Sequence, residues 1–143
     1  MRVSIVIAAR RAVVWDAVRD IESHVEWMSD AFAIRFTSPS HAGVGTTFDC
    51  DTRIGPLRLV DRMTITAWKP KKAMGVRHVG LVTGSGLFRL RRASHGRTRF
   101  TWTEVLSFPW WMGGPIGAWL GAPVLRRIWS RNLRNLKALV EGS

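Results

Sequence analysis

Three ionisable side chains, Asp61, His78 and Glu104, fall on the apolar faces of predicted strands. In each strand the residues two positions away are mostly leucine, methionine, valine or tryptophan, and alternation places them on the same face. Burial in apolar surroundings tends to raise the pKa of a carboxyl group into the range used for acid–base catalysis. These residues are therefore candidate catalytic groups that polarise a carbonyl or move a proton on an apolar substrate.

The same three residues also have a purely structural interpretation, in which each neutralises an arginine or bonds a ligand hydroxyl. A bulge, or a shift of one residue in strand register, would turn any of them to solvent. The apolar residues around them predict a hydrophobic wall, and aromatic rings there would suit a flat ligand. The candidate ligand-binding residues are Trp27, Phe48, Met63, Met74, Val76, Phe88, Leu90, Trp102, Leu106, Trp119 and Trp129.

Strands make up most of the framework that positions these groups. A first strand is predicted at residues 3–7, and a period of two then dominates from residue 30 to residue 108. Turn signals divide this region into six strands, at residues 31–37, 45–53, 57–69, 73–79, 84–92 and 97–108. Consecutive strands joined by short turns predict an antiparallel sheet.

Helical spacing flanks the strands on both sides. A helix begins at Arg11, and its apolar face consists of Val14, Val18, Ile21 and Val25, with a break near residue 21. Apolar residues from 125 to 140 predict a long amphipathic helix with Pro123 in its first turn. The segment between the last strand and this helix, residues 108–121, is predicted to be a flexible loop because it is rich in glycine and proline.

Composition limits the class of protein. The chain has 143 residues, 46% of them hydrophobic, which predicts one domain over residues 1–143 and excludes a disordered protein. The single cysteine, Cys50, can form neither an internal disulfide nor a thiolate cluster, so a cytoplasmic location is expected. His24, His41, Asp49 and Asp51 are assigned to loops, a helix surface or an outer strand face, and no metal or other cofactor is predicted.

The net charge of +12 is expected to lie mostly on the outside, and 18 of the 22 basic residues are arginine. Nucleic acid is an unlikely partner, because the outer strand faces offer threonine rather than exposed aromatic residues. An anionic membrane surface is a better candidate, with Trp110, Trp111, Arg126 and Arg127 as the contact residues. In the alternative interpretation, the tryptophans only close a cavity and the arginines only increase solubility.

The order of elements resembles the START-like (SRPBCC) helix-grip superfamily, and specifically its polyketide cyclase/dehydrase-like members of the coenzyme Q-binding and lipid-transport type. The matching motifs cover residues 12–28, the turn at residues 43–46, and the terminal residues 125–137. One departure is Arg10 or Arg11, which stands where the family often carries a proline before the first helix.

This resemblance implies an α+β fold in which a curved antiparallel sheet wraps the last helix and encloses a hydrophobic cavity. The implied partner is a small hydrophobic ligand such as a lipid, a polyketide or an isoprenoid molecule. We therefore predict binding of such a ligand, with two alternatives: a polyketide cyclase or dehydratase that uses Glu104, Asp61 and His78, and a peripheral-membrane lipid carrier.

Overall fold

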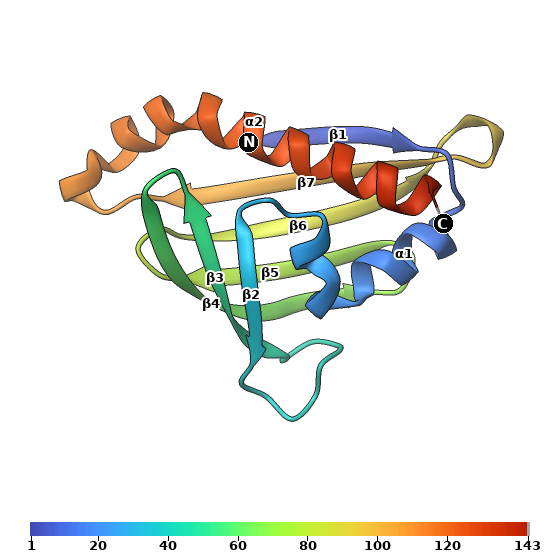
Figure 1. Ribbon diagram of the computed structural model, residues 1–143, viewed down its shortest axis with the longest axis horizontal. Coiled ribbons are helices and arrows are strands. Elements are labelled where there is room, and N and C mark those ends of the chain that lie inside the picture. Colours follow the sequence, from blue (N-terminus) through green and yellow to red (C-terminus); the bar gives the residue numbers. More distant parts are fainter. Residues whose placement is uncertain (143) are drawn as a thin grey trace.

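A single seven-stranded antiparallel sheet and one long helix dominate the computed structural model, which describes residues 1–142 (Figure 1). The strands are β1 (Arg2–Ile7), β2 (Ala31–Phe36), β3 (Thr47–Ile54), β4 (Leu57–Lys69), β5 (Ala73–Val79), β6 (Thr83–Arg92) and β7 (Thr98–Ser107). The helices are α1 (Arg11–Arg19), η1 (Ile21–Glu26), η2 (Ser94–Gly96), η3 (Trp110–Met112) and α2 (Gly114–Glu141). Their arrangement confirms the predicted α+β helix-grip fold.

The order of strands across the sheet is β1-β7-β6-β5-β4-β3-β2, so only β1 is out of sequence order. It pairs with β7 and forms one edge of the sheet, and α2 packs against this edge. Strand alternation sends one set of side chains toward α2: in β7, Phe100, Trp102 and Glu104 are buried while Arg99 is exposed. Because the sheet is antiparallel, its other face can remain solvated and polar.

The core is densest where α1, η1 and the second half of α2 meet the sheet. Fully buried side chains there include Ile7, Val14, Ile21, Phe100 and Leu136. Burying each such aliphatic or aromatic side chain contributes about 1.5–3 kcal/mol. Leu133 and Leu136 of α2 fall at i and i+3, so one stripe of the helix faces this core while Arg131 and Arg134 stay in solvent.

The beginning of α2 differs from the sequence prediction. The helix begins at Gly114 rather than near Pro123, so the predicted flexible loop is largely helical and Pro123 lies inside the helix. Pro115 occupies the first turn, where a backbone N–H has no intrahelical acceptor. Gly117 is required by close packing, because a Cβ at this position would lie 1.9 Å from the backbone carbonyl oxygen of Met112.

The first helical region also differs in one detail. The predicted apolar face included Val25, which is instead 37% exposed, and His24 takes the buried position. The reason is that Ile21–Glu26 is a 3-10 helix with three residues per turn, so the 3.6-residue spacing of α1 does not continue through it.

Candidate functional site

A cavity of about 350 Å³ lies between the concave face of the sheet and α2. Its walls are largely aliphatic and aromatic, with a small number of polar side chains. All three candidate catalytic residues, Asp61, His78 and Glu104, line it. The candidate ligand-binding residues on its walls are Phe48, Met63, Met74, Val76, Phe88, Trp102, Leu106 and Trp129. An apolar cavity with a few convergent polar groups is the usual form of a small-molecule site.

The structure does not bring Trp27, Leu90 or Trp119 to the cavity wall. Trp27 is 1% exposed and packs behind the wall, with its ring centroid 6.4 Å from that of Trp102. Leu90 is paired with Phe100 in the core and is also buried. Trp119 points away from the cavity, because it lies on the outer face of an α2 segment that was expected to be a loop.

His78 and Glu104 form the central polar pair of the site. His78 Nε2 lies 3.1 Å from Glu104 Oε2, and the indole Nε1 of Trp102 donates a hydrogen bond of 3.0 Å to Glu104 Oε1. Both members of the pair are buried, at 8% and 6% exposure. Burial by itself would lower the pKa of His78, but the hydrogen bond and charge of Glu104, with the charge of Asp61, raise that pKa above its ordinary value. The geometry therefore favours a protonated imidazole against a carboxylate.

Gly86 makes room for this pair. It is the β6 residue directly opposite Glu104, and a Cβ at this position would lie 2.5 Å from Glu104 Oε1. The atom in its way is the end of a flexible side chain, so an alanine would displace the carboxylate rather than the backbone. Gly86 was not identified from the sequence, since nothing in the sequence indicates which residue stands opposite Glu104.

We expect Gly86→Ala to lower the pKa of His78, because moving the carboxylate removes the contact that raises it while burial still acts. The measurement is an NMR titration of the His78 ring in both proteins. Ser85→Ala, an exposed neighbour on the same strand, is the control and should leave the titration unchanged. An unshifted His78 pKa in Gly86→Ala would contradict this account of the pair.

Two further carboxyl groups face the cavity with raised pKa values. Burial raises the pKa of Asp61, although the Thr52 hydroxyl donates a hydrogen bond of 3.2 Å to it. Burial likewise raises the pKa of Asp30, whose Oδ1 accepts a hydrogen bond of 2.7 Å from Asn132 Nδ2. A protonated carboxyl group can donate a hydrogen bond to a ligand oxygen. The site thus combines one ion pair with two carboxyl groups biased toward their neutral form.

Asp30 and Asn132 were missed in the sequence analysis. Asn132 is fully buried on α2, and its Oδ1 accepts hydrogen bonds of 2.9 Å from both the backbone N–H and the hydroxyl of Ser29. These contacts fasten the helix to the segment between η1 and β2 and orient Asp30 toward the cavity. Residues 29 and 132 are 103 positions apart, so no local spacing signals the contact.

His24 is another missed cavity residue, since a helix surface or loop was expected for it. Its Nε2 donates a hydrogen bond of 2.6 Å to the backbone carbonyl of Val18, so the neutral tautomer carries its proton on Nε2. Burial lowers the pKa of His24 from 6.5 to about 4. His24 is therefore neutral at pH 7 and contributes shape and a hydrogen bond rather than charge.

This depressed pKa predicts a loss of stability in acid. In the unfolded chain His24 takes up a proton near pH 6.5, whereas in the folded protein it does so only near pH 4. The contribution of His24 to the free energy of unfolding is therefore complete above pH 6.5 and is lost as the pH falls from 6.5 to 4. The difference amounts to about 3 kcal/mol in the free energy of unfolding. In urea unfolding at pH 7 and pH 4, His24→Gln should show a smaller acid loss than the wild type. His95→Asn, in an exposed turn, should show the same loss as the wild type.

Cys50 also lines the cavity, beside the Thr52 hydroxyl at 3.8 Å. Burial raises the pKa of its thiol to about 11, so it stays protonated and is a poor nucleophile. Asp49 and Asp51 lie on the outer face of β3, where Asp51 pairs with Arg35 at 2.8 Å. Within residues 1–142, no group of three or more histidine, cysteine, aspartate and glutamate side chains could hold a metal ion.

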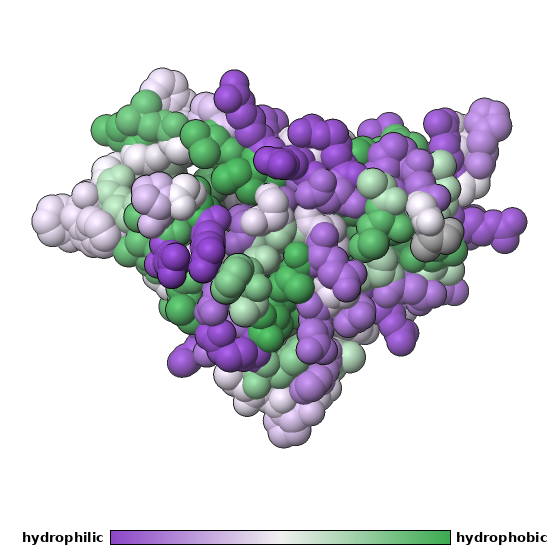
Figure 2. Space-filling view, viewed as in Figure 1, coloured by the Kyte–Doolittle hydropathy of each residue, from purple (hydrophilic) through white to green (hydrophobic). Residues whose placement is uncertain are grey.

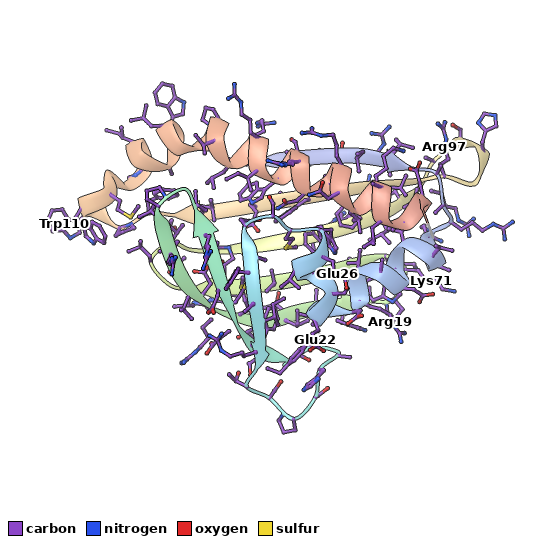
Figure 3. All side chains as sticks on the ribbon, viewed as in Figure 1. Arg19, Glu22, Glu26, Lys71, Arg97 and Trp110 are labelled. Atoms are coloured by element: carbon purple, nitrogen blue, oxygen red, sulfur yellow. The ribbon has the colours of Figure 1, made fainter. Side chains whose placement is uncertain are left out.

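An exposed apolar surface lies at the beginning of α2, on a segment that also lines the cavity. Phe108, Met112, Val124 and Leu125 line the cavity from this segment. Six residues of this segment are exposed, and we call them the apolar collar: Trp110, Trp111, Ile116, Trp119, Leu120 and Val124. Val124 belongs both to the collar and to the cavity lining. Figure 3 shows Trp110 at the extreme end of the molecule, and Figure 2 shows green and pale surface over this end of α2. No helix among the described residues is both long and apolar enough to cross a membrane.

Comparisons with known proteins agree with this architecture. The sequence model of a family described as "Polyketide cyclase / dehydrase and lipid transport" matches residues 1–141. The comparison with curated proteins found no match. Among solved structures, the Zhui aromatase/cyclase from Streptomyces sp. R1128 superposes with a TM-score of 0.80 at 15% identity, covering 99% of this chain and 92% of that one.

Two other solved structures also superpose on the whole chain at low sequence identity. A conserved protein from Geobacillus kaustophilus has a TM-score of 0.83 at 15% identity and covers 99% of this chain and 95% of its own. The di-domain ARO/CYC StfQ from the steffimycin biosynthetic pathway has a TM-score of 0.75 at 13% identity, covering 99% of this chain and 44% of that one. At these identities the structural likeness establishes the fold alone.

Proposed function

Because the chain belongs to the polyketide cyclase / dehydrase and lipid transport family, we propose that it binds a small hydrophobic molecule in the cavity between the sheet and α2. The observation that carries this proposal is the cavity itself, of about 350 Å³, with apolar walls and five histidine and acidic side chains that converge on it. A well-packed protein interior contains few voids larger than a water molecule. The open volume therefore favours a ligand over simple core packing.

The chemistry of the walls supports a polyketide or another aromatic or isoprenoid molecule as the ligand. Trp102 and Trp129 stack with ring centroids 5.3 Å apart and present a broad flat surface to the cavity. Asp30 and Asp61, when protonated, can donate hydrogen bonds to ligand oxygens, and Glu104 can accept one from a hydroxyl. A molecule with flat apolar rings and several oxygens would use both kinds of surface, whereas a saturated chain would leave the polar groups without partners.

Native mass spectrometry of the purified protein tests this proposal, followed by extraction and identification of any bound apolar molecule. We expect a ligand in stoichiometric amount, or uptake of one from a panel of aromatic polyketides, isoprenoid quinones, sterols and fatty acids. A ligand-free mass together with no uptake from the whole panel would contradict the proposal.

A second candidate function is catalysis of aldol cyclisation or dehydration, favoured by the buried pair of His78 and Glu104. In an aldol closure, Glu104 would take a proton from the carbon beside one carbonyl, and that carbon would attack a second carbonyl whose oxygen receives a proton from Asp61. Exchange with solvent then returns a proton from Glu104 to Asp61. In dehydration Glu104 would take a further proton from the same carbon, and Asp61 would give its proton to the hydroxyl, which departs as water. The raised pKa values of Asp61 and His78 support proton-donor roles, because each group keeps its proton to a higher pH than an ordinary residue of its type.

A third candidate, a peripheral-membrane lipid carrier, is favoured by the apolar collar. Trp110 and Trp119 are 87% and 74% exposed, which is unusual for side chains of this size. Arg126 and Arg127 follow on the same helix and are exposed. Interfacial tryptophans beside arginines are suited to an anionic bilayer. Docking at this end would bring the part of the cavity lined by Phe108, Met112 and Leu125 close to lipid, and an apolar ligand that entered there would not have to cross water.

A further inference from the structure

A basic depression lies at the end of the molecule away from the apolar collar. It encloses about 470 Å³ and is lined by five cationic side chains, Arg10, Arg11, Lys71, Arg92 and Arg97. They come from the start of α1, the β4–β5 turn, and the end of β6 with the β6–β7 connection that follows it. Figure 3 shows Lys71 and Arg97 at one end of the molecule and Trp110 at the other. Neither the cavity ligand nor membrane docking uses this surface.

The depression has no negative charge of its own. The rest of its lining is alanine and glycine, namely Ala12, Ala93 and Gly96. Among the ion pairs of the described residues, none involves any of the five cations. Five like charges around one concavity repel one another, and a bound anion would remove that repulsion.

One member of the cluster is held in place. Arg97 donates hydrogen bonds of 2.9 Å from Nε to the Ser94 carbonyl and of 2.7 Å from Nη2 to the Ser94 hydroxyl, which fixes its guanidinium at the edge of the depression. Arginine binds phosphate oxygens through paired N–H donors, and four of the five cations here are arginine. A guanidinium that is already positioned loses less conformational entropy on binding.

From this arrangement we infer that the depression binds a polyphosphate, an anion with two or more linked phosphate groups. A single phosphate could contact only part of a cluster contributed by three separate segments, whereas a chain of phosphates can contact all of them. The lining contains no aromatic ring on which a base could stack, so recognition rests on the phosphates alone. Inorganic tripolyphosphate and a nucleoside triphosphate share this chemistry.

Isothermal titration calorimetry with sodium tripolyphosphate, at fixed ionic strength, tests the site. The cluster variant Arg10→Gln, Lys71→Gln, Arg92→Gln avoids Arg97 and its turn, and should bind at least about 10-fold more weakly than the wild type. The matched control, Arg126→Gln, Arg127→Gln, Arg131→Gln, removes the same charge from exposed positions on α2 and should keep wild-type affinity. Arg92→Gln alone should also weaken binding. This single variant tests the site if the triple variant folds poorly.

Several outcomes would overturn the inference. They are no binding by the wild type, equal weakening in the cluster variant and the α2 control, and full affinity in the cluster variant. Equal weakening would show that net charge rather than this site attracts the anion. ATP should bind about as tightly as tripolyphosphate, and binding of ATP alone would contradict recognition through phosphates. A short oligonucleotide that binds through the same three residues more tightly than tripolyphosphate would assign the surface to nucleic acid instead.

Discussion

Replacing Trp110 and Trp119 together with alanine is expected to weaken binding to anionic vesicles by at least about 100-fold. If about 100 Å² of each ring leaves water on docking, each contributes about 2.5 kcal/mol at ~25 cal/mol per Å². The two side chains are the most exposed members of the apolar collar, so their removal should leave the fold intact. Co-sedimentation with phosphatidylglycerol-containing vesicles measures the effect.

The control is a variant that removes exposed apolar surface elsewhere. Val13→Ser with Val44→Ser changes two exposed valines, on α1 and in the β2–β3 loop, and should bind vesicles like the wild type. Raising the salt concentration should weaken wild-type binding, because each arginine near the surface contributes about 1 kcal/mol of screened attraction. If the wild type does not bind anionic vesicles even at low salt, the carrier function is excluded.

The polar groups of the sheet could be predicted from sequence because strand alternation is a local rule. Residues two apart share a face, so the apolar neighbours of Asp61, His78 and Glu104 were enough to place them. Strand alternation does not indicate which residues of neighbouring strands lie next to each other. The contact of His78 with Glu104 depends on β6 lying between β5 and β7, and on the absence of a side chain at Gly86.

The parts that could not be predicted depend on contacts between distant segments. His24 is buried because a 3-10 turn rotates it inward, and Asp30 faces the cavity because Asn132 of α2 holds it. The early start of α2 has a similar origin. Glycine and proline disfavour a helix in isolation, but Gly117 lets the first turn of α2 approach the Met112 carbonyl closely, and the Phe108 ring packs against the same segment. These contacts outweigh local propensity.

The prediction that separates an enzyme from a binding protein is Glu104→Gln. Glutamine has nearly the same volume and can still accept the hydrogen bond from the Trp102 indole, so the cavity should keep its shape and its ligand affinity. It cannot take a proton, however, and it no longer offers His78 a charged partner. If Glu104 is the base, turnover of a poly-β-keto substrate should fall by at least about 100-fold, in line with general base catalysis.

The measurement compares turnover with ligand affinity in the same preparations. Val105→Ala, at the exposed neighbour of Glu104 on β7, is the matched control and should change neither quantity. Asp61→Asn should lower turnover as well, because an amide cannot supply the proton to the second carbonyl oxygen. A Glu104→Gln protein with unchanged turnover would remove the base from the mechanism. Loss of affinity and turnover together would instead give Glu104 a binding role, since a catalytic base acts on the rate without being needed for binding.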